Sequence, residues 1–404
     1  MSLISAAQRT EPVARTVTIL GSTGSVGRNT VELIQARPEL FVVEAITGNK
    51  NVALLAEQAR SLKAKLAVTA DPHSYTALKD ALGGSGIEVA AGPKALIDAA
   101  CRPTDWLMAS IVGAAGLEPT WEAARRGAVI GLANKECLVC AGELLMAEVA
   151  RCGATIVPVD SEHSAIFQVF DFDAADSVEQ IILTASGGPF RCYSREQLSS
   201  VTPEQAVAHP NWSMGAKISV DSATMMNKGL ELIEAYHLFP VEASQIEIVV
   251  HPQSVIHSLV SYVDGSVLAQ LGQPDMRTPI AFALAWPRRM KTPAARLSLA
   301  EVGQLSFEQP DEERFQALRL AREALQAGGA ATAVLNAANE VAVHSFLNRD
   351  IQFLDIVRVV DGCLESSVGL KASSLSAVMN IDQQTREQAR QLVAKCGFSK
   401  TYVN

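Results

Sequence analysis

The chain has 404 residues, 48% hydrophobic and 19% charged, which predicts a globular protein of two or three domains with a sizeable core. Its formal net charge of -9 disfavours a nucleic-acid-binding protein and means that an anionic ligand needs placed donors, a metal ion, or both. No apolar run approaches the roughly 18 residues of a membrane span, and the first fourteen residues lack the apolar core of a secretory signal. The seven scattered cysteines are typical of free thiols in a reducing compartment, so we expect a cytoplasmic protein that binds neither membrane nor nucleic acid.

Short apolar runs alternate with helical patterns over the first 159 residues. Helices are expected at 26–36 and 52–62, and strands at 17–20, 41–47, 66–69, 88–91, 106–109 and 129–132. Such alternation with short connections predicts an α/β domain with a parallel, doubly wound, Rossmann-like sheet over residues 1–159.

The pattern changes after residue 159. Strands are expected at 181–185, 246–250, 256–260 and 266–271, the later ones as antiparallel neighbours, which predicts a central α+β domain over 160–285. Four prolines, Pro274, Pro279, Pro287 and Pro293, mark an irregular connecting region, with a linker at 286–311. Helices expected at 313–327, 331–347, 353–367 and 383–396 form a C-terminal helical bundle over 312–404.

A glycine-rich loop with the sequence GSTGSVG follows the first strand at 21–27 and opens the first helix. Glycines there let the backbone approach a pyrophosphate, and the free N–H groups of the helix start can bind its charge. The second strand ends in Asn49, Lys50 and Asn51, without the acid that usually holds the ribose of NAD. This favours NADP, although a solvated lysine in a polar loop is the alternative.

Three acids are candidates for a metal site. Asp160 and Glu162 follow an apolar run, and in extended backbone they would point the same way and could share one cation; the alternative is a helix cap. Glu231 is the third, with Asn227 or Lys228 on the same helical face; the alternative is a surface Lys–Glu helix pair, which would be the default interpretation elsewhere. Oxygen ligands favour Mg²⁺ or Mn²⁺.

The densest polar stretch runs from residue 209 to residue 231. Its hydroxyl, amide and ammonium groups are suited to phosphate oxygens, and they belong to Ser213, Ser219, Ser222, Thr224, Asn227 and Lys228. Trp212 and Met214 could cover a small substrate, and a small-residue turn at 184–189 offers a second place for an anion. Taken singly, each serine is more simply a turn or cap residue. Among the histidines, His163 could lie behind the acids, whereas His251 and His257 are expected to be structural.

These segments together resemble the 1-deoxy-D-xylulose 5-phosphate reductoisomerase family. The resemblance is carried by GSTGSVG at 21–27, LANKE at 132–136, VDSEHSAIFQ at 159–168, TASGGPF at 184–190, HPNWSMG and KISVDSATMMNKGLE within 209–231, HPQSVIHSLV at 251–260 and NAANEVAV at 336–343. They occur in this order and span most of the chain.

The resemblance implies roles for individual residues. The NADPH pyrophosphate and ribose would be contacted by Thr23, Gly24, Ser25 and Val26, the 2′-phosphate region by Asn49, Lys50 and Asn51, and other parts of the cofactor by Asn134, Glu136 and Gly215. The ligands of Mg²⁺ or Mn²⁺ would be Asp160, Glu162 and Glu231. Substrate hydroxyls and carbonyl would be held by Lys135, Ser161 and Glu162, and the phosphate end by Ser186, His209, Ser222, Asn227 and Lys228, with Trp212 on a flexible lid. Catalysis would rest on Lys135, His209 and the three acids. The family usually has a glycine where Asn49 stands, which leaves that one contact in doubt.

The implied activity is the rearrangement of 1-deoxy-D-xylulose 5-phosphate to an aldehyde and its reduction by NADPH to 2-C-methyl-D-erythritol 4-phosphate, in non-mevalonate isoprenoid biosynthesis. The rearrangement would follow either a retro-aldol and aldol route or an α-ketol shift, and the protein would be a homodimer. The residues alone also allow an NADP-dependent dehydrogenase without a metal, or a non-catalytic dinucleotide sensor. The sensor would have no use for the acids and Lys228 together.

Overall fold

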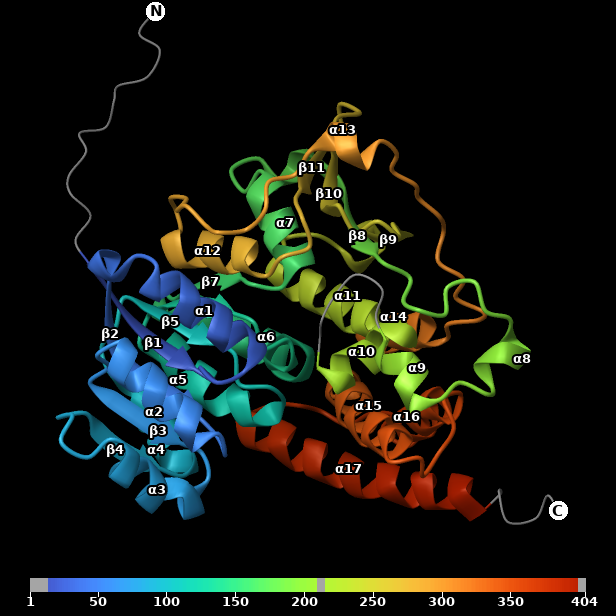
Figure 1. The fold of residues 1–404 in the computed structure, drawn as a ribbon. Helices are drawn as coiled ribbons and strands as arrows, with labels where there is room; N and C mark the ends of the chain where they lie inside the picture. Colours follow the sequence, from blue (N-terminus) through green and yellow to red (C-terminus); the bar gives the residue numbers. More distant parts are fainter. Residues whose placement is uncertain (1–13, 209–214, 399–404) are drawn as a thin grey trace, which may run out of the picture.

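The structure is a computed structural model that describes residues 14–208 and 215–398 (Figure 1). Two of the predicted site residues, His209 and Trp212, lie outside the described residues, as do Ser213 and Met214. None of the described helices is both long enough and apolar enough to span a bilayer.

A seven-stranded parallel sheet forms the N-terminal part, in the order β4-β3-β2-β1-β5-β6-β7. Its strands are β1 Arg15–Leu20, β2 Phe41–Gly48, β3 Leu66–Thr69, β4 Glu88–Ala91, β5 Trp106–Ala109, β6 Val129–Leu132 and β7 Thr155–Pro158. Strands such as β3 and β5 are buried throughout, because helices cover both faces of a parallel sheet and leave room only for apolar side chains. The doubly wound, Rossmann-like fold predicted from the sequence is confirmed.

Helices cover the two faces of this sheet in separate groups. One face carries α1 Ser25–Gln35, α2 Val52–Ser61, α3 Tyr75–Ala81 and α12 Arg277–Ala285, and the other carries α4 Pro93–Cys101, α5 Leu117–Arg125 and α6 Glu136–Cys152. Helix α12 corrects the expectation of an irregular region around the prolines. Pro279 lies in the first turn of α12, where a proline removes no intrahelical hydrogen bond, and Ile280 and Leu284 are buried in the same core as α1.

The central part is built on a four-stranded mixed sheet in the order β11-β10-β8-β9. Its strands are β8 Val178–Ala185, β9 Ile246–Val250, β10 Ile256–Tyr262 and β11 Val267–Leu271. Strand β10 is antiparallel to β8 and β11, as predicted for the later strands, whereas β8 and β9 are parallel. The helices of this part are α7 Ser161–Val169, α8 Arg195–Leu198, α9 Pro203–Val207, α10 Ala216–Ala223 and α11 Met226–Leu238.

The C-terminal helices pack beside the central part rather than apart from it (Figure 1). They are α13 Leu299–Val302, α14 Ala317–Ala327, α15 Ala331–Leu347, α16 Asp355–Glu365 and α17 Leu375–Phe398. Helix α14 begins four residues later than expected, because the Asp311 carboxylate accepts the backbone N–H of Arg314 at 2.9 Å in a turn, and α17 begins eight residues earlier. One continuous core joins α11, α14, α15 and α16, so the bundle supports the helix that carries Glu231.

Short 3-10 turns connect several of these elements. They lie at Pro38–Leu40, Pro72–Ser74, Ala114–Gly116, Ala175–Ser177 and Ala243–Gln245.

Candidate active site

The glycine loop lies between β1 and β5, where the strand order of the parallel sheet reverses. Gly21 has a φ of +84°, and a Cβ there would lie 2.7 Å from the carbonyl oxygen of Ser110, the residue after β5. A Cβ on Gly27 would lie 2.2 Å from the carbonyl oxygen of Gly21, so a side chain fits at neither position. The loop therefore stays close to the sheet and leaves Gly24 and Ser25 exposed at the start of α1, where backbone N–H groups can bind an anion.

The tip of β2 carries no available acid. Asn49 and Lys50 are exposed, while the side chain of Asn51 caps α2 by accepting the backbone N–H of Leu54 at 3.2 Å. Glu44, the acid within β2, forms ion pairs with Lys65 at 2.6 Å and Arg102 at 3.1 Å. This arrangement fits a cofactor with a 2′-phosphate better than a free ribose hydroxyl.

Two predicted cofactor residues are engaged in contacts within the protein. The buried amide of Asn134 donates to the carbonyl oxygen of Gly113 at 3.0 Å and accepts the backbone N–H of Cys137 at 3.1 Å. Glu136 is also buried, with its carboxylate 3.8 Å from the ammonium of Lys217. Both side chains shape the start of α6 and do not line the cavity described next.

A cavity of about 1230 Å³, including its open mouth, lies between the glycine loop and the four-stranded sheet. It brings together most of the predicted site residues, namely Ser25, Val26, Lys135, Asp160, Ser161, Glu162, Ser186, Gly215, Ser222, Asn227, Lys228 and Glu231. Thr23, Gly24 and the residues of the β2 tip lie outside its lining. Asn29, Ser254, His257 and Met276 line it without having been singled out as site residues.

The acids converge for a different reason than the one proposed from the sequence. Asp160 is the N-cap of α7, and Ser161 and Glu162 form its first turn, so the extended backbone assumed for the pair is wrong and the helix-cap alternative holds. Glu231 projects from α11. One carboxylate oxygen from each of Asp160, Glu162 and Glu231 lies within 4.8 Å of the others, which is close enough for the three to share one cation.

Two lysines lie among these acids. Lys135 approaches Asp160 at 3.1 Å and Glu231 at 3.5 Å, and Lys228 approaches Glu162 at 3.1 Å and also pairs with Glu231. Burial alone would lower the pKa of Lys135, but the carboxylates of Asp160 and Glu231 raise it well above its usual value. Both lysines therefore stay charged and offer ammonium groups to an anionic ligand.

The charge of Glu231 is poorly balanced by these lysines alone. Burial, followed by the negative charge of Glu162, raises the pKa of Glu231 to about 8. A divalent cation would remove this repulsion, and a set of three carboxylate oxygens suits Mg²⁺ or Mn²⁺ rather than a softer metal. The donor set thus fits the predicted metal.

Ser186 and Ser222 are brought together by a tight turn after β8. Gly188, with a φ of +68°, leaves no room for a side chain, because a Cβ there would lie 2.6 Å from the carbonyl oxygen of Ser222. Lys228 lines the same cavity, as expected for an anion-binding end. Ser219 and Thr224 do not line it, since Ser219 is buried and the Thr224 hydroxyl donates to the carbonyl oxygen of Val220 at 3.1 Å.

Of the two histidines predicted to be structural, one lines the cavity. His251 is structural, as expected: its Nδ1 lies 2.9 Å from the carbonyl oxygen of Ser306, and its Nε2 accepts the backbone N–H of Val255 at 3.2 Å. His257 is also buried but lines the cavity. His257 lies on β10, two residues from the buried Val255. The sequence pattern there does not distinguish a residue of the core from one that lines a cavity.

Cys137 and Cys140, near the start of α6, are packed as buried helical cysteines. Both thiols are buried, and burial raises the pKa of Cys137 to about 12, so a reactive thiolate is disfavoured.

The site combines three features: a dinucleotide loop, an acid cluster that fits a divalent cation, and lysines that suit an anion. Together they define a class of cofactor- and metal-dependent enzymes that act on a small anionic substrate. Family models identify the class more closely. Residues 17–142 match 1-deoxy-D-xylulose 5-phosphate reductoisomerase, residues 156–239 match its C-terminal domain, and residues 271–388 match the DXP reductoisomerase C-terminal domain.

Individual relatives agree with the family models. The reductoisomerase of Rhodospirillum centenum is 63% identical over 94% of this chain and 94% of its own length, and that of Zymomonas mobilis is 56% identical over 94% and 98%. Among solved structures, the Zymomonas mobilis enzyme in complex with NADPH has a TM-score of 0.91 at 54% identity, covering 94% of this chain and 99% of its own. A DOX-P reductoisomerase in complex with NADPH, fosmidomycin and magnesium has a TM-score of 0.90 at 42% identity, covering 94% and 98%. The chain belongs to the 1-deoxy-D-xylulose 5-phosphate reductoisomerase family.

Proposed function

We propose that this chain catalyses the NADPH- and divalent-metal-dependent conversion of 1-deoxy-D-xylulose 5-phosphate to 2-C-methyl-D-erythritol 4-phosphate. The observation that carries the proposal is the convergence of Asp160, Glu162 and Glu231 within one cavity that also reaches the glycine loop. A plain dehydrogenase without a metal has no need for three acids placed together at a site for an anionic substrate. The family membership points to the same reaction.

The metal would be held by Asp160, Glu162 and Glu231. When bound, it supplies Lewis acidity to the keto and hydroxyl oxygens of the substrate, and the nicotinamide supplies hydride. Lys135 lies against Asp160 and Glu231 and donates to the Asn227 side-chain oxygen at 2.8 Å. Its ammonium group thereby fixes the amide and the acids relative to one another and can donate to a substrate oxygen.

The phosphate end of the substrate would bind between Ser186, Ser222 and Lys228, with Asn227 beside them. His209, outside the described residues, completes this set in the proposal, and Trp212, also outside them, would sit on a lid over the substrate. Binding energy from the phosphate positions the reacting carbons, which is how a remote group of a substrate accelerates a reaction. Ser25, Val26 and Gly215 also line the cavity and would receive the cofactor. Its adenosine half would lie along Thr23, Gly24, Asn49, Lys50 and Asn51, with Asn134 and Glu136 behind it.

The test is NADPH oxidation that requires both 1-deoxy-D-xylulose 5-phosphate and Mg²⁺ or Mn²⁺. Wild type is expected to turn over only with all three present, and Glu231→Gln is expected to lose at least about 100-fold in kcat/KM and to need more metal, because a neutral amide is a weaker ligand. Turnover that survives a chelator would instead support a metal-free dehydrogenase. A Glu231→Gln enzyme with the wild-type rate and metal dependence would contradict the three-acid site.

A homodimer is proposed on the strength of an open sheet edge. Strand β11 is the outer strand of the four-stranded sheet, and Val267 and Leu268 on it are 52% and 48% exposed, with Val263 69% exposed nearby. An exposed apolar edge strand is a template for pairing with another chain. Light scattering is expected to give twice the chain mass for wild type and a lower mass for Leu268→Lys, whereas Val368→Lys, at a residue 88% exposed elsewhere, serves as the matched control.

The reaction is proposed to take place in the cytoplasm. The described part of the chain includes all seven cysteines, and none forms a disulfide, which is typical of a reducing compartment.

A further inference from the structure

Helix α1 contributes three residues to the lining of the cavity, namely Ser25, Val26 and Asn29. Asn29 follows Val26 by three positions and Ser25 by four, so the three side chains share one face of the helix. Helical side chains also tilt towards the N-terminus of their helix. The Asn29 amide therefore covers the turn that begins at Ser25, directly after the glycine loop.

The Asn29 amide makes no hydrogen bond within the described part of the chain, although the side chains on either side of it do. Arg28 donates to the carbonyl oxygen of Thr23 at 3.1 Å, and the Thr30 hydroxyl donates to that of Val26 at 2.9 Å. Asparagine is also a weak helix former, because its amide competes for backbone hydrogen bonds. This position of α1 therefore gives up some helix stability for an amide that is available to a ligand in the cavity.

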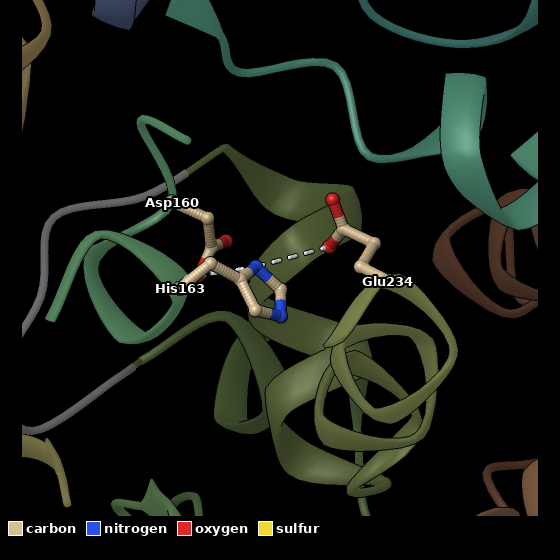
Figure 2. A group of neighbouring side chains, drawn as sticks. All are labelled: Asp160, His163 and Glu234. Atoms are coloured by element: carbon tan, nitrogen blue, oxygen red, sulfur yellow. Dashed lines mark ion pairs between the residues drawn. The ribbon is translucent and has the colours of Figure 1, made fainter. Parts of the chain in front are cut away.

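The polar side chains on the acid side of the cavity are paired with one another instead. Lys135 lies 3.1 Å from Asp160. Figure 2 shows a further layer behind Asp160, where the imidazole of His163 lies 3.7 Å from the carboxylates of both Asp160 and Glu234. These groups serve the proposed metal site, so side-chain hydrogen bonds to the cofactor are expected from α1.

The part of NADPH that would enter the cavity is its nicotinamide half. The tip of β2, which suits the 2′-phosphate, does not line the cavity, whereas the start of α1, which suits the pyrophosphate, does. A substrate held by the three acids also has to lie beside the nicotinamide, because reacting atoms must come within about 3–3.5 Å of each other. Val26 and Met276 line the cavity and pack against the core that α1 shares with α12, which gives an aromatic ring an apolar wall next to Asn29.

We propose that Asn29 binds the carboxamide of the nicotinamide, donating to its carbonyl oxygen and accepting one of its N–H groups. Asparagine and the carboxamide each offer a donor and an acceptor, so two hydrogen bonds form side by side. This pair fixes the rotation of the ring about its bond to the ribose, and so selects the face of the ring that meets the substrate. The inference rests on the proposed function, because it requires NADPH to occupy the cavity.

The test compares NADPH with its reduced 3-acetylpyridine analogue, in which a methyl group replaces the amide nitrogen of the carboxamide. Isothermal titration calorimetry measures the Kd of each for the full-length protein without substrate. Wild type is expected to bind the analogue at least about 10-fold more weakly than NADPH, because the Asn29 oxygen loses its donor. Asn29→Leu is expected to bind NADPH at least about 10-fold more weakly than wild type does, and to bind the two cofactors with Kd values within about twofold of each other. Asn29→Asp keeps an acceptor and should still prefer NADPH.

Gln35→Leu provides the matched control for replacing an amide on α1. Gln35 is exposed, donates to the Ser61 hydroxyl at 2.8 Å and does not line the cavity, so both Kd values should stay within about twofold of wild type. The proposal is overturned if Asn29→Leu binds NADPH as wild type does, or if wild type binds the two cofactors equally well. Weaker binding to Asn29→Leu with the preference for NADPH intact would assign Asn29 to a ribose hydroxyl and also overturn it. If wild type neither binds NADPH nor turns over, the proposed function itself fails, which separates the two outcomes.

Discussion

His237 on α11 shows how one half-buried base can make stability depend on pH. Its imidazole fills the space left by Gly142 on α6, where a Cβ would lie 2.2 Å from a ring carbon. Burial lowers the pKa of His237 to about 4. The unfolded chain, with a pKa of about 6.5 at this residue, therefore binds a proton at a higher pH than the folded protein does.

The sign of the pH effect follows from this difference. The stability contributed by neutral His237 is fully present above about pH 6.5 and is lost as the pH falls towards 4, by at most about 3 kcal/mol. Urea unfolding of wild type and His237→Gln at several pH values between 7 and 4 measures the effect. The difference between the two proteins should change by that amount across the window, and a constant difference would show that His237 titrates normally in the folded protein.

The same scale shows where sequence reasoning stops. Asp160 and Glu162 were recognised as a pair, but by an argument from extended backbone that is wrong, because Asp160 caps α7. Lys135 and Glu231, 96 positions apart, approach at 3.5 Å, and nothing in hydrophobic periodicity predicts a contact of that kind. The family resemblance implied a role for each of these residues, whereas the residue patterns alone only made the acids candidates for a metal site.

At the scale of elements, α15 holds the helix that leads into the anion-binding end of the cavity. The Asn339 amide donates to the Asp221 carboxylate at 2.8 Å, joining α15 to α10, and both side chains are almost fully buried. Lys217 pairs with the other oxygen of Asp221 at 2.9 Å. Since Ser222 follows Asp221 directly, this contact fixes a residue of the proposed phosphate site.

Replacing Asn339 should therefore affect both stability and substrate binding. Asn339→Leu is expected to cost about 1–3 kcal/mol, because the Asp221 carboxylate loses a buried partner, and to raise the KM for 1-deoxy-D-xylulose 5-phosphate more than it lowers kcat. Asn336→Leu is the matched control, since Asn336 is equally buried on α15 but donates to Glu340 at 3.1 Å. Equal effects of the two variants on KM would rule out a specific role for the α15–α10 contact.

Elements differ in how well the sequence predicted them. The bounds of β3, β5 and β6 were predicted correctly, because strands buried on both faces are short apolar runs bounded by polar residues. Helix α12 was missed, since Pro279 reads as a break until its place in a first turn is known. Helix α14 begins late because the Asp311 carboxylate accepts the backbone N–H of Arg314 and closes a competing turn, which helical periodicity does not record.

At the scale of the whole molecule, the predicted order of a parallel α/β part, an α+β part and a helical part is confirmed. What the sequence did not predict is that the last two share one core, which includes α11, β8 and α15. A hydrophobic pattern shows which face of each helix is buried but not which partner covers it. The proposed metal-binding acids therefore rest at the start of α7 and on α11, held between the two sheets and the bundle.

This arrangement makes the stability of the molecule depend on the metal. Without a cation, burial and then the negative charge of Glu162 raise the pKa of Glu231, so its carboxylate is poorly stabilised. A cation that binds only the folded state stabilises that state by mass action. At a free Mg²⁺ concentration 100 times its Kd the gain is about 2.7 kcal/mol, so a chelator should lower the Tm of the whole chain by several degrees. Differential scanning calorimetry with and without Mg²⁺ measures this shift. The Mg²⁺-induced rise in Tm should be small in Glu231→Gln. The rise in Tm that NADPH produces should remain in this variant, because its glycine loop is unchanged. A full Mg²⁺-induced rise in Glu231→Gln would place the stabilising metal elsewhere.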